Sequence, residues 1–185
     1  PQSVWNKKGA DILRAWTAST DFRNEMSFSE ESLERTADAY RRIRNTIRFL
    51  MGNLNDFDFQ KDKISGDRYS ELDKWIVLKT KDLQTEVIKD LENYDIHFSF
   101  QKILNFCTNE LGGFYLDIIK DRLYTSKRDG SARRSAQSAM HQIYTSLLTL
   151  VAPILSFTAE ESYLEKNGTG TSIFLSEWFK LTSTC

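Results

Sequence analysis

The chain has 185 residues, of which 28% are charged and 40% are hydrophobic, and its formal net charge is -1. This composition excludes a mainly disordered chain, and its most apolar stretch, 147–155, is far shorter than the roughly 20 residues that cross a bilayer. Cys107 and Cys185 are too few for a disulfide framework or a zinc cluster, so we expect a cytoplasmic protein whose nucleic-acid binding would need a local basic face.

The first part of the chain predicts two helices, because apolar residues recur there at helical spacing. One covers 3–19, with a break near Gly9. Ser27 and Glu30 have the spacing of a capping box for the second, which we expect to end near residue 54. Its expected buried stripe consists of Leu33, Ala37, Tyr40, Ile43, Ile47, Leu50 and Leu54.

A polar loop over 55–68 separates these from two further predicted helices, 69–94 and one that starts near Ile96. Gly112 and Gly113 interrupt the latter and favour a kink or a close backbone approach, because glycine weakens a helix interior. Its expected inward side chains are Phe100, Ile103, Leu104, Cys107, Leu111, Phe114, Ile118 and Leu123.

The last part begins with a turn at 127–130 and a helix over 131–151 that Pro153 ends. The expected inward residues of this helix are Ala136, Met140, Ile143, Leu147 and Leu150. Thr158 and Glu161 resemble a second capping box, for a short last helix. After a turn at 167–170, we expect a short strand at 172–175.

Together these patterns predict an all-α protein, an antiparallel helix bundle with a helical N-terminal extension. We expect three parts: an extension over 1–28, the bundle over 29–166, and a C-terminal tail over 167–185 that carries the short strand.

No pattern of catalytic residues is present: the chain lacks phosphate-loop, dinucleotide-binding, nucleophile-elbow and zinc-protease motifs. His97 and His141 have no partner at metal-ligand spacing, and Cys107 falls on an apolar stripe. We therefore expect no catalytic residue and no metal ligand in this chain.

Basic residues offer a different kind of site. Arg41, Arg44 and Arg48 lie within about 60° of one another on the predicted helix, with Arg42 beside them and Asn45 adjacent. Guanidinium groups bind phosphates because they donate in pairs and lose water readily. A second basic group follows further along the chain: Lys120, Arg122, Lys127, Arg128, Arg133 and Arg134.

These residues alone leave three readings open: RNA binding, a helical protein-interaction module, and a plain structural bundle. Glu34 and Asp38 are spaced for ion pairs with the arginines of the same helix, which would make the row an ordinary solvated face. The neighbours Phe114 and Tyr115 are more typical of a core than of a base-stacking surface.

Four stretches resemble the anticodon-binding domain of class Ia aminoacyl-tRNA synthetases: ADAYRRIRNTIRFLMGNL at 37–54, NFCTNELGGFYLDIIKDRLYTS at 105–126, ARRSAQSAM at 132–140 and LVAPILSFTAEE at 150–161. GADILRAW at 9–16, followed by DFRNEMSFSEE at 21–31, resembles the segment that leaves the catalytic domain. Their order and spacing also fit. The sequence of these stretches is most similar to that of isoleucyl enzymes of bacterial type, with valyl enzymes as the alternative.

The resemblance implies a tRNA-binding role. Residues 1–28 would touch the inner corner of the tRNA, where Arg23 is the candidate contact, and the bundle would hold the anticodon stem and loop. Asn45 and Arg48 match positions that face the anticodon loop in related enzymes. Phe114 or Tyr115 is the nearest match to a stacking aromatic, and the remaining candidates are Arg41, Arg44, Lys120, Arg122, Lys127, Arg128, Arg133 and Arg134.

The resemblance also implies a larger parent enzyme that joins isoleucine to its tRNA with ATP and Mg²⁺. The HIGH and KMSKS motifs of its ATP site do not occur, and KISGD at 63–67 is no substitute. We expect no cofactor in this segment, although a zinc module follows the bundle in many relatives. Expected partners are an isoleucine tRNA and the rest of the synthetase, with no membrane and no DNA.

Overall fold

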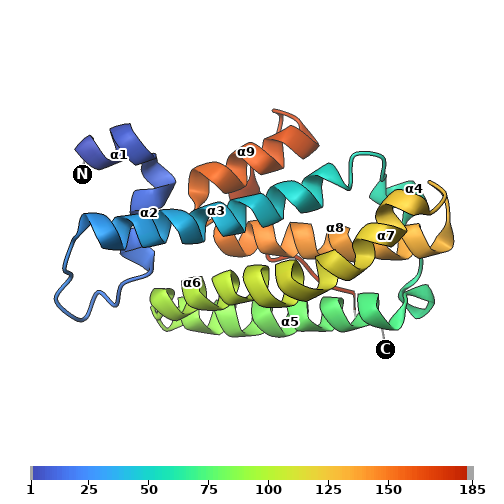
Figure 1. Cartoon of the computed structure of the whole chain (residues 1–185), viewed down its shortest axis with the longest axis horizontal. Coiled ribbons are helices and arrows are strands. Elements are labelled where there is room, and N and C mark those ends of the chain that lie inside the picture. The colour runs from blue at the N-terminus through green and yellow to red at the C-terminus, as the bar shows by residue number, and fades with distance from the viewer. Residues whose placement is uncertain (1, 183–185) are drawn as a thin grey trace.

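The computed structural model describes residues 2–182, and it is helical in all its regular elements (Figure 1). The predicted all-α antiparallel bundle is confirmed. Cys185 lies outside the described residues. The principal helices are α1 (Gln2–Lys8), α2 (Ala10–Ala18), α3 (Glu30–Gly52), α5 (Glu71–Glu92), α6 (Ile96–Asn105), α7 (Leu116–Thr125), α8 (Ser131–Val151) and α9 (Ser156–Asn167).

Helix α8 is the centre of the bundle. It packs against α3, α5, α7 and α9, and its side chains from Ser135 to Met140 and from Ser146 to Val151 are all buried (Figure 1). Small residues such as Ala136 and Ala139 allow neighbouring backbones to approach, while Leu147 and Leu150 fill the core. The helices around it therefore supply the outward-facing surface of the bundle.

The start of α3 differs from its prediction. The helix begins at Glu30, and its cap is Ser29, whose hydroxyl accepts a hydrogen bond from the Ser32 backbone N–H at 3.0 Å. The Ser32 hydroxyl accepts in turn from the Ser29 N–H at 3.2 Å. The predicted Ser27–Glu30 box was wrong, because Ser32 supplies the returning acceptor that a glutamate usually provides.

The predicted polar loop over 55–68 is more structured and better packed than expected. It contains the one-turn helix α4 (Phe59–Asp62) and the 3-10 turn η1 (Gly66–Arg68). Phe57 is 7% exposed and anchors this segment in the main core. The segment is therefore a fixed part of the bundle.

The C-terminal tail has no strand where one was predicted. Residues Ile173–Leu175 form the 3-10 turn η3, and the Ile173 N–H donates to the Glu160 carboxylate rather than to a neighbouring strand. Beyond it, side-chain amides on α5 and α8 hold the extended tail: Gln84 donates to the Phe179 carbonyl, and Gln142 accepts from the Thr182 N–H.

The pair Gly112–Gly113 lies in a π-helical stretch, η2 (Phe106–Tyr115), between α6 and α7. A methyl group on Gly112 would lie 2.9 Å from the Cys107 carbonyl oxygen, which explains the glycine. Because a π-helix needs more residues per turn, the inward positions follow a four-residue spacing through η2. These buried residues are Ile103, Cys107, Leu111, Tyr115, Ile119 and Leu123.

This change of period corrects part of the predicted core. Ile118 and Phe114 are 48% and 46% exposed, whereas their neighbours Ile119 and Tyr115 are fully buried. Leu104, also predicted as core, is half-buried. When the ordinary α-helical period is extended through the glycines, it therefore predicts Phe114 and Ile118 as inward residues. The residues that are buried lie one position later in the chain.

Helix α9 is capped by a residue from another helix. The buried Asp11 carboxylate of α2 accepts hydrogen bonds from the backbone N–H groups of Phe157 and Thr158, at 3.3 and 2.7 Å. The predicted Thr158–Glu161 box was wrong, because Thr158 lies inside the first turn and its hydroxyl is hydrogen-bonded to Tyr40.

We expect Asp11→Ala to destabilise the chain by about 0.5–2 kcal/mol, because it removes the side chain that caps α9. Urea-induced unfolding followed by circular dichroism measures the loss. Asp129→Ala is the control, because Asp129 lies exposed in the turn before α8. Equal stability of the wild type and Asp11→Ala would contradict the capping role.

Candidate nucleic-acid interface

The arginines of α3 lie on its outward side, opposite the buried residues Ile43 and Ile47. Within residues 2–182, the only arginines of this helix with a carboxylate within 4 Å are Arg35 and Arg41. Arg41 pairs with Asp38 at 2.5 Å and, by this hydrogen bond, lowers the pKa of that carboxyl. The predicted salt-bridged face is therefore present in part.

The other arginines of α3 have no acidic partner within 4 Å in the described chain. Arg42, Asn45 and Arg48 are exposed, and Arg44 is half-buried. We call these four residues the α3 row. Their cationic groups are carried by a helix packed against the core. Arg42 and Arg44 project from opposite flanks of its outward side, roughly 160° apart, and Asn45 and Arg48 lie between them.

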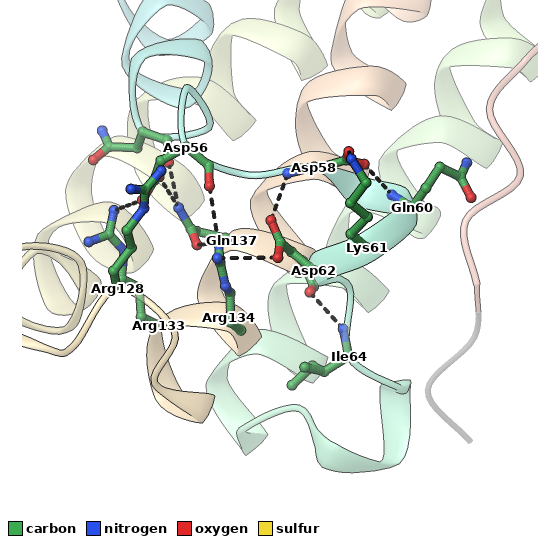
Figure 2. A network of polar contacts seen from close by, with 12 residues as sticks. Asp56, Asp58, Gln60, Lys61, Asp62, Ile64, Arg128, Arg133, Arg134 and Gln137 are labelled. Atoms are coloured by element: carbon green, nitrogen blue, oxygen red, sulfur yellow. Dashed lines mark hydrogen bonds and ion pairs between the residues drawn. The ribbon is translucent and has the colours of Figure 1, made fainter.

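Half of the second basic group, namely Arg128, Arg133 and Arg134, pairs with carboxylates of the loop over 55–68 (Figure 2). The Asp56 carboxylate pairs with Arg133 at 2.9 Å and with Arg128 at 3.3 Å, and it accepts a hydrogen bond from Gln137 at 2.8 Å. Arg134 pairs with Asp62 at 3.3 Å. These contacts join the loop to the start of α8.

Opposing effects act on the pKa of Asp56. Partial burial alone would raise it, but the Gln137 hydrogen bond and the charges of Arg133 and Arg128 outweigh this and hold the pKa below its usual value. Asp56 therefore stays ionised near neutral pH. Arg133 and Arg134 have a structural role here, and their side chains are only 20% and 13% exposed.

Arg122 belongs to a second internal network, around the fully buried Asp73 of α5. Its guanidinium donates to both carboxylate oxygens, at 3.0 and 3.2 Å. Tyr115 donates its hydroxyl to the same carboxylate at 2.7 Å, and burial raises the pKa of Tyr115 well above its usual value. Tyr115 has no exposed surface. Tyr115 therefore offers no ring face to a base, and Arg122 is occupied within the bundle.

The other candidates remain at the surface. Phe114 packs edge-on against Trp75, with ring centroids 5.2 Å apart. Lys120 pairs with Asp117 on its own helix, while Lys127 is exposed. Arg128 keeps 74% of its side chain exposed despite its contact with Asp56. Lys127 and Arg128 thus stay available to a ligand, at the opposite end of α7 from Phe114.

Arg23 lies away from both basic groups. It pairs with Asp21 at 2.9 Å and with Asp95 at 2.7 Å, and so ties the loop after α2 to the start of α6. Its hydrogen bond to Asp21, which raises the pKa of Arg23, is local. The structure therefore does not bring Arg23 together with the α3 row.

His141 and Cys107 have packing roles. His141 stacks on Phe59 at 4.1 Å, and burial lowers its pKa to about 4. Cys107 is buried, which raises the pKa of its thiol to about 12. Among residues 2–182, no three histidine, cysteine or acidic side chains are grouped as metal ligands. Within the same residues, no helix is both long and apolar enough to cross a membrane.

Sequence reasoning did not find Trp75, Asp56 or Asp73 as parts of these sites. Asp73 had a detectable signal, because it lies at helical spacing with the buried residues Ile76, Thr80 and Val87. A carboxylate on an inward stripe requires partners, since an unpaired buried charge is very costly. Nothing in the spacing of Asp56 indicated its arginine partners, which are distant in the chain.

Comparisons with known proteins give one consistent result. Residues 73–184 match the family described as anticodon-binding domain of tRNA ligase. The chain is 52% identical over 184 residues to an isoleucine–tRNA ligase of Ruthia magnifica and 51% identical over 181 residues to one of Shewanella baltica. Each alignment covers 97% of this chain but only 20% and 19% of the relative.

The fold is similar to part of a solved structure, that of a LeuRS of Agrobacterium radiobacter in a ternary complex with tRNA and LeuAMS. The TM-score is 0.68 and the identity is 14%, over 98% of this chain and 21% of that one. At this identity the likeness concerns the fold alone.

Proposed function

The chain belongs to the anticodon-binding domains of tRNA ligases, and we propose from this that it binds the anticodon stem and loop of a tRNA through the α3 row. The observation that carries this proposal is the contrast between the two basic groups. Arg42, Arg44 and Arg48 have no carboxylate within 4 Å in the described chain, whereas Asp73, Asp56 and Asp62 hold Arg122, Arg133 and Arg134 of the second group.

The chemistry of the row suits an RNA loop. Arginines bind the phosphates that flank unpaired bases, and an amide such as that of Asn45 can pair with a base edge. Phe114, next to Trp75, offers an exposed ring that suits stacking on an unpaired base. The alternative, a helical protein-interaction module, is less well supported, because the α3 row is polar and charged.

We also propose that this segment comes from a cytoplasmic isoleucine–tRNA ligase and that its partner is an isoleucine tRNA. The relatives near 50% identity support the isoleucine enzyme over the valine one. The chain spans about one fifth of the length of these relatives. ATP-dependent joining of isoleucine to tRNA then belongs to the remaining polypeptide, together with any Mg²⁺ or zinc.

We expect Arg48→Ala to weaken tRNA binding by about 1–3 kcal/mol and to lower the salt slope by about one phosphate contact, while the melting temperature stays unchanged. Fluorescence anisotropy with a labelled anticodon stem-loop, over a range of salt concentrations, measures both quantities. Arg35→Ala is the matched control, because Arg35 is an exposed arginine of α3 that pairs with Glu31. Equal losses for the two variants would mean diffuse electrostatic attraction and would remove the α3 row as the site.

Asn45→Ala should behave differently, because the change removes no charge. We expect weaker binding with an unchanged salt slope, and a larger loss for the isoleucine anticodon than for another anticodon. The same anisotropy assay with two stem-loops that differ only in the anticodon makes the comparison. A uniform loss for both would show that Asn45 does not read a base.

A further inference from the structure

Lys166, in the last turn of α9, differs from the other lysines of the chain in its surroundings. Within residues 2–182, the half-buried lysines are Lys8, Lys74, Lys102 and Lys166. The first three each pair with a carboxylate, whereas Lys166 has none within 4 Å in the same residues. A partly buried amine without a counter-charge costs free energy, so its position calls for an explanation.

The amine of Lys166 lies against an aromatic ring. Its Nζ atom is 5.2 Å from the ring centroid of Tyr144, a residue of α8 that is only 2% exposed. Burial lowers the pKa of Lys166. Near neutral pH, a larger share of this amine is therefore uncharged than in an ordinary lysine, and the uncharged amine is the form that attacks a carbonyl carbon.

A cavity of about 290 Å³ adjoins this amine. We call it the tail cavity, because α8, the end of α9 and the C-terminal tail enclose it. Helices α8 and α9 lie side by side, and η3 of the tail packs against α9 (Figure 1). The principal lining residues are His141, Tyr144, Leu148, Lys166, Ile173 and Phe179. Its volume is at the small end of the range for ligand sites, so it suits a short organic group.

The groups that face Lys166 do not hold its amine in the charged form. His141 is neutral near neutral pH, because burial lowers its pKa to about 4. Glu165 precedes Lys166 on α9 and Glu177 of the tail lines the cavity, but neither carboxylate is within 4 Å of Nζ. The residues that face it from the end of α3 and the following loop are uncharged: Met51, Leu54, Asn55 and Phe57.

The tail cavity also contains a polar atom without a partner. The Nδ1 atom of His141 is buried and has no hydrogen-bond partner among the described residues. The opposite ring face is not free, because His141 stacks on Phe59. A small polar group that enters the cavity can therefore bond to this nitrogen while its apolar part contacts Leu148 and Ile173.

We propose that Lys166 is a modification site, whose amine takes a short acyl group from a small acyl phosphate. The amine nitrogen attacks the carbonyl carbon, and a carbon–nitrogen bond forms. The bond from that carbon to the phosphate oxygen breaks, and the phosphate leaves with the electron pair and with one proton of the amine. The product is a neutral amide, which burial no longer disfavours. This inference does not depend on tRNA binding.

Acetyl phosphate is the probe for the first test. The chain is treated at about pH 7 and about pH 10, and mass spectrometry of its peptides gives the rate at each lysine. Near pH 7, Lys166 should react severalfold faster than Lys127, an exposed lysine without a carboxylate within 4 Å in the described chain. The ratio should fall towards pH 10, because the exposed amine then gains its uncharged form as well.

A pair of variants tests the role of the missing counter-charge. Thr145→Glu adds a carboxylate to the wall of the tail cavity, and Thr145→Gln is the uncharged control of similar shape. Thr145 is half-buried on α8 and donates its hydroxyl to the His141 carbonyl. A carboxylate near Lys166 favours its charged form. We expect Thr145→Glu to slow the modification severalfold near neutral pH and Thr145→Gln to leave it unchanged.

The outcomes separate a reactive lysine from a merely shielded one. Equal rates at Lys166 and Lys127 near neutral pH would overturn the proposal, and so would modification of Lys166 that appears only in urea. Equal effects of Thr145→Glu and Thr145→Gln would overturn it too, because the charge of the amine would then have no part in the reaction. If circular dichroism shows that Thr145→Glu does not fold, the rates of the wild-type chain at the two pH values still decide.

Discussion

Asp73→Ala is expected to destabilise the chain by about 3–5 kcal/mol, because the change leaves the guanidinium of Arg122 without its charge partner inside the bundle. The Asp73 carboxylate accepts two hydrogen bonds from that guanidinium and one each from Ser70, Tyr115 and Ser135. These donors belong to η2, α7, α8 and the cap of α5. Loss of the acceptor therefore affects several helices at once. Urea-induced unfolding measures the resulting change in the free energy of unfolding.

A double variant shows whether the loss of stability comes from the broken charge pair or from the cavity that the smaller side chain leaves. In Asp73→Ala combined with Arg122→Leu, no buried charge remains unpaired, so we expect a smaller loss than the sum of the two single changes. A loss below about 1 kcal/mol for Asp73→Ala alone would show that water replaces its contacts without difficulty.

Ile119→Ala should cost about 2–5 kcal/mol, whereas Ile118→Ala should cost less than about 1 kcal/mol. The two residues are adjacent and chemically identical, but Ile119 is fully buried and Ile118 is 48% exposed. The π-helical stretch alone decides which of them faces the core. Chemical denaturation of both variants, under one set of conditions, measures the difference.

This pair also tests the helical period. If α6, η2 and α7 formed one regular α-helix, the predicted inward residue would be Ile118 and the order of the two losses would be reversed. Equal losses would indicate that this helix exchanges between two registers. Gly113→Ala also tests the π-helical stretch, because the added methyl group would lie 3.1 Å from the Thr108 carbonyl oxygen of η2.

The periodic parts of the fold were predictable from sequence. The bounds of α8 were predicted correctly, and the ends of α3 and α5 were close, because long amphipathic stripes and terminating residues such as Pro153 determine them locally. The helix starts were less predictable. Ser29 replaced Ser27 as a cap, and the cap of α9 came from Asp11, because a capping group can come from a distant segment as well as from nearby sequence.

The candidate site was predictable in the same limited sense. The outward position of Arg48 and Asn45 follows from the stripe of α3, which is local information. The hydrogen bond of Tyr115 and the pairing of Arg122, Arg133 and Arg134 depend on carboxylates that lie 42 to 77 residues away in the chain. A count of basic residues therefore overestimates the charge that an RNA can meet.

The cap that Asp11 provides has a consequence for the order of folding. It joins residues 147 positions apart, so α9 receives its N-terminal cap from a helix that lies far earlier in the chain. Such distant contacts form late, because closing a long loop costs entropy before any contact repays it. Helix α2 must therefore wait for α9 before the corner between them is complete. We expect this corner to be the step that closes the bundle, and Asp11→Ala to speed unfolding more than it slows folding.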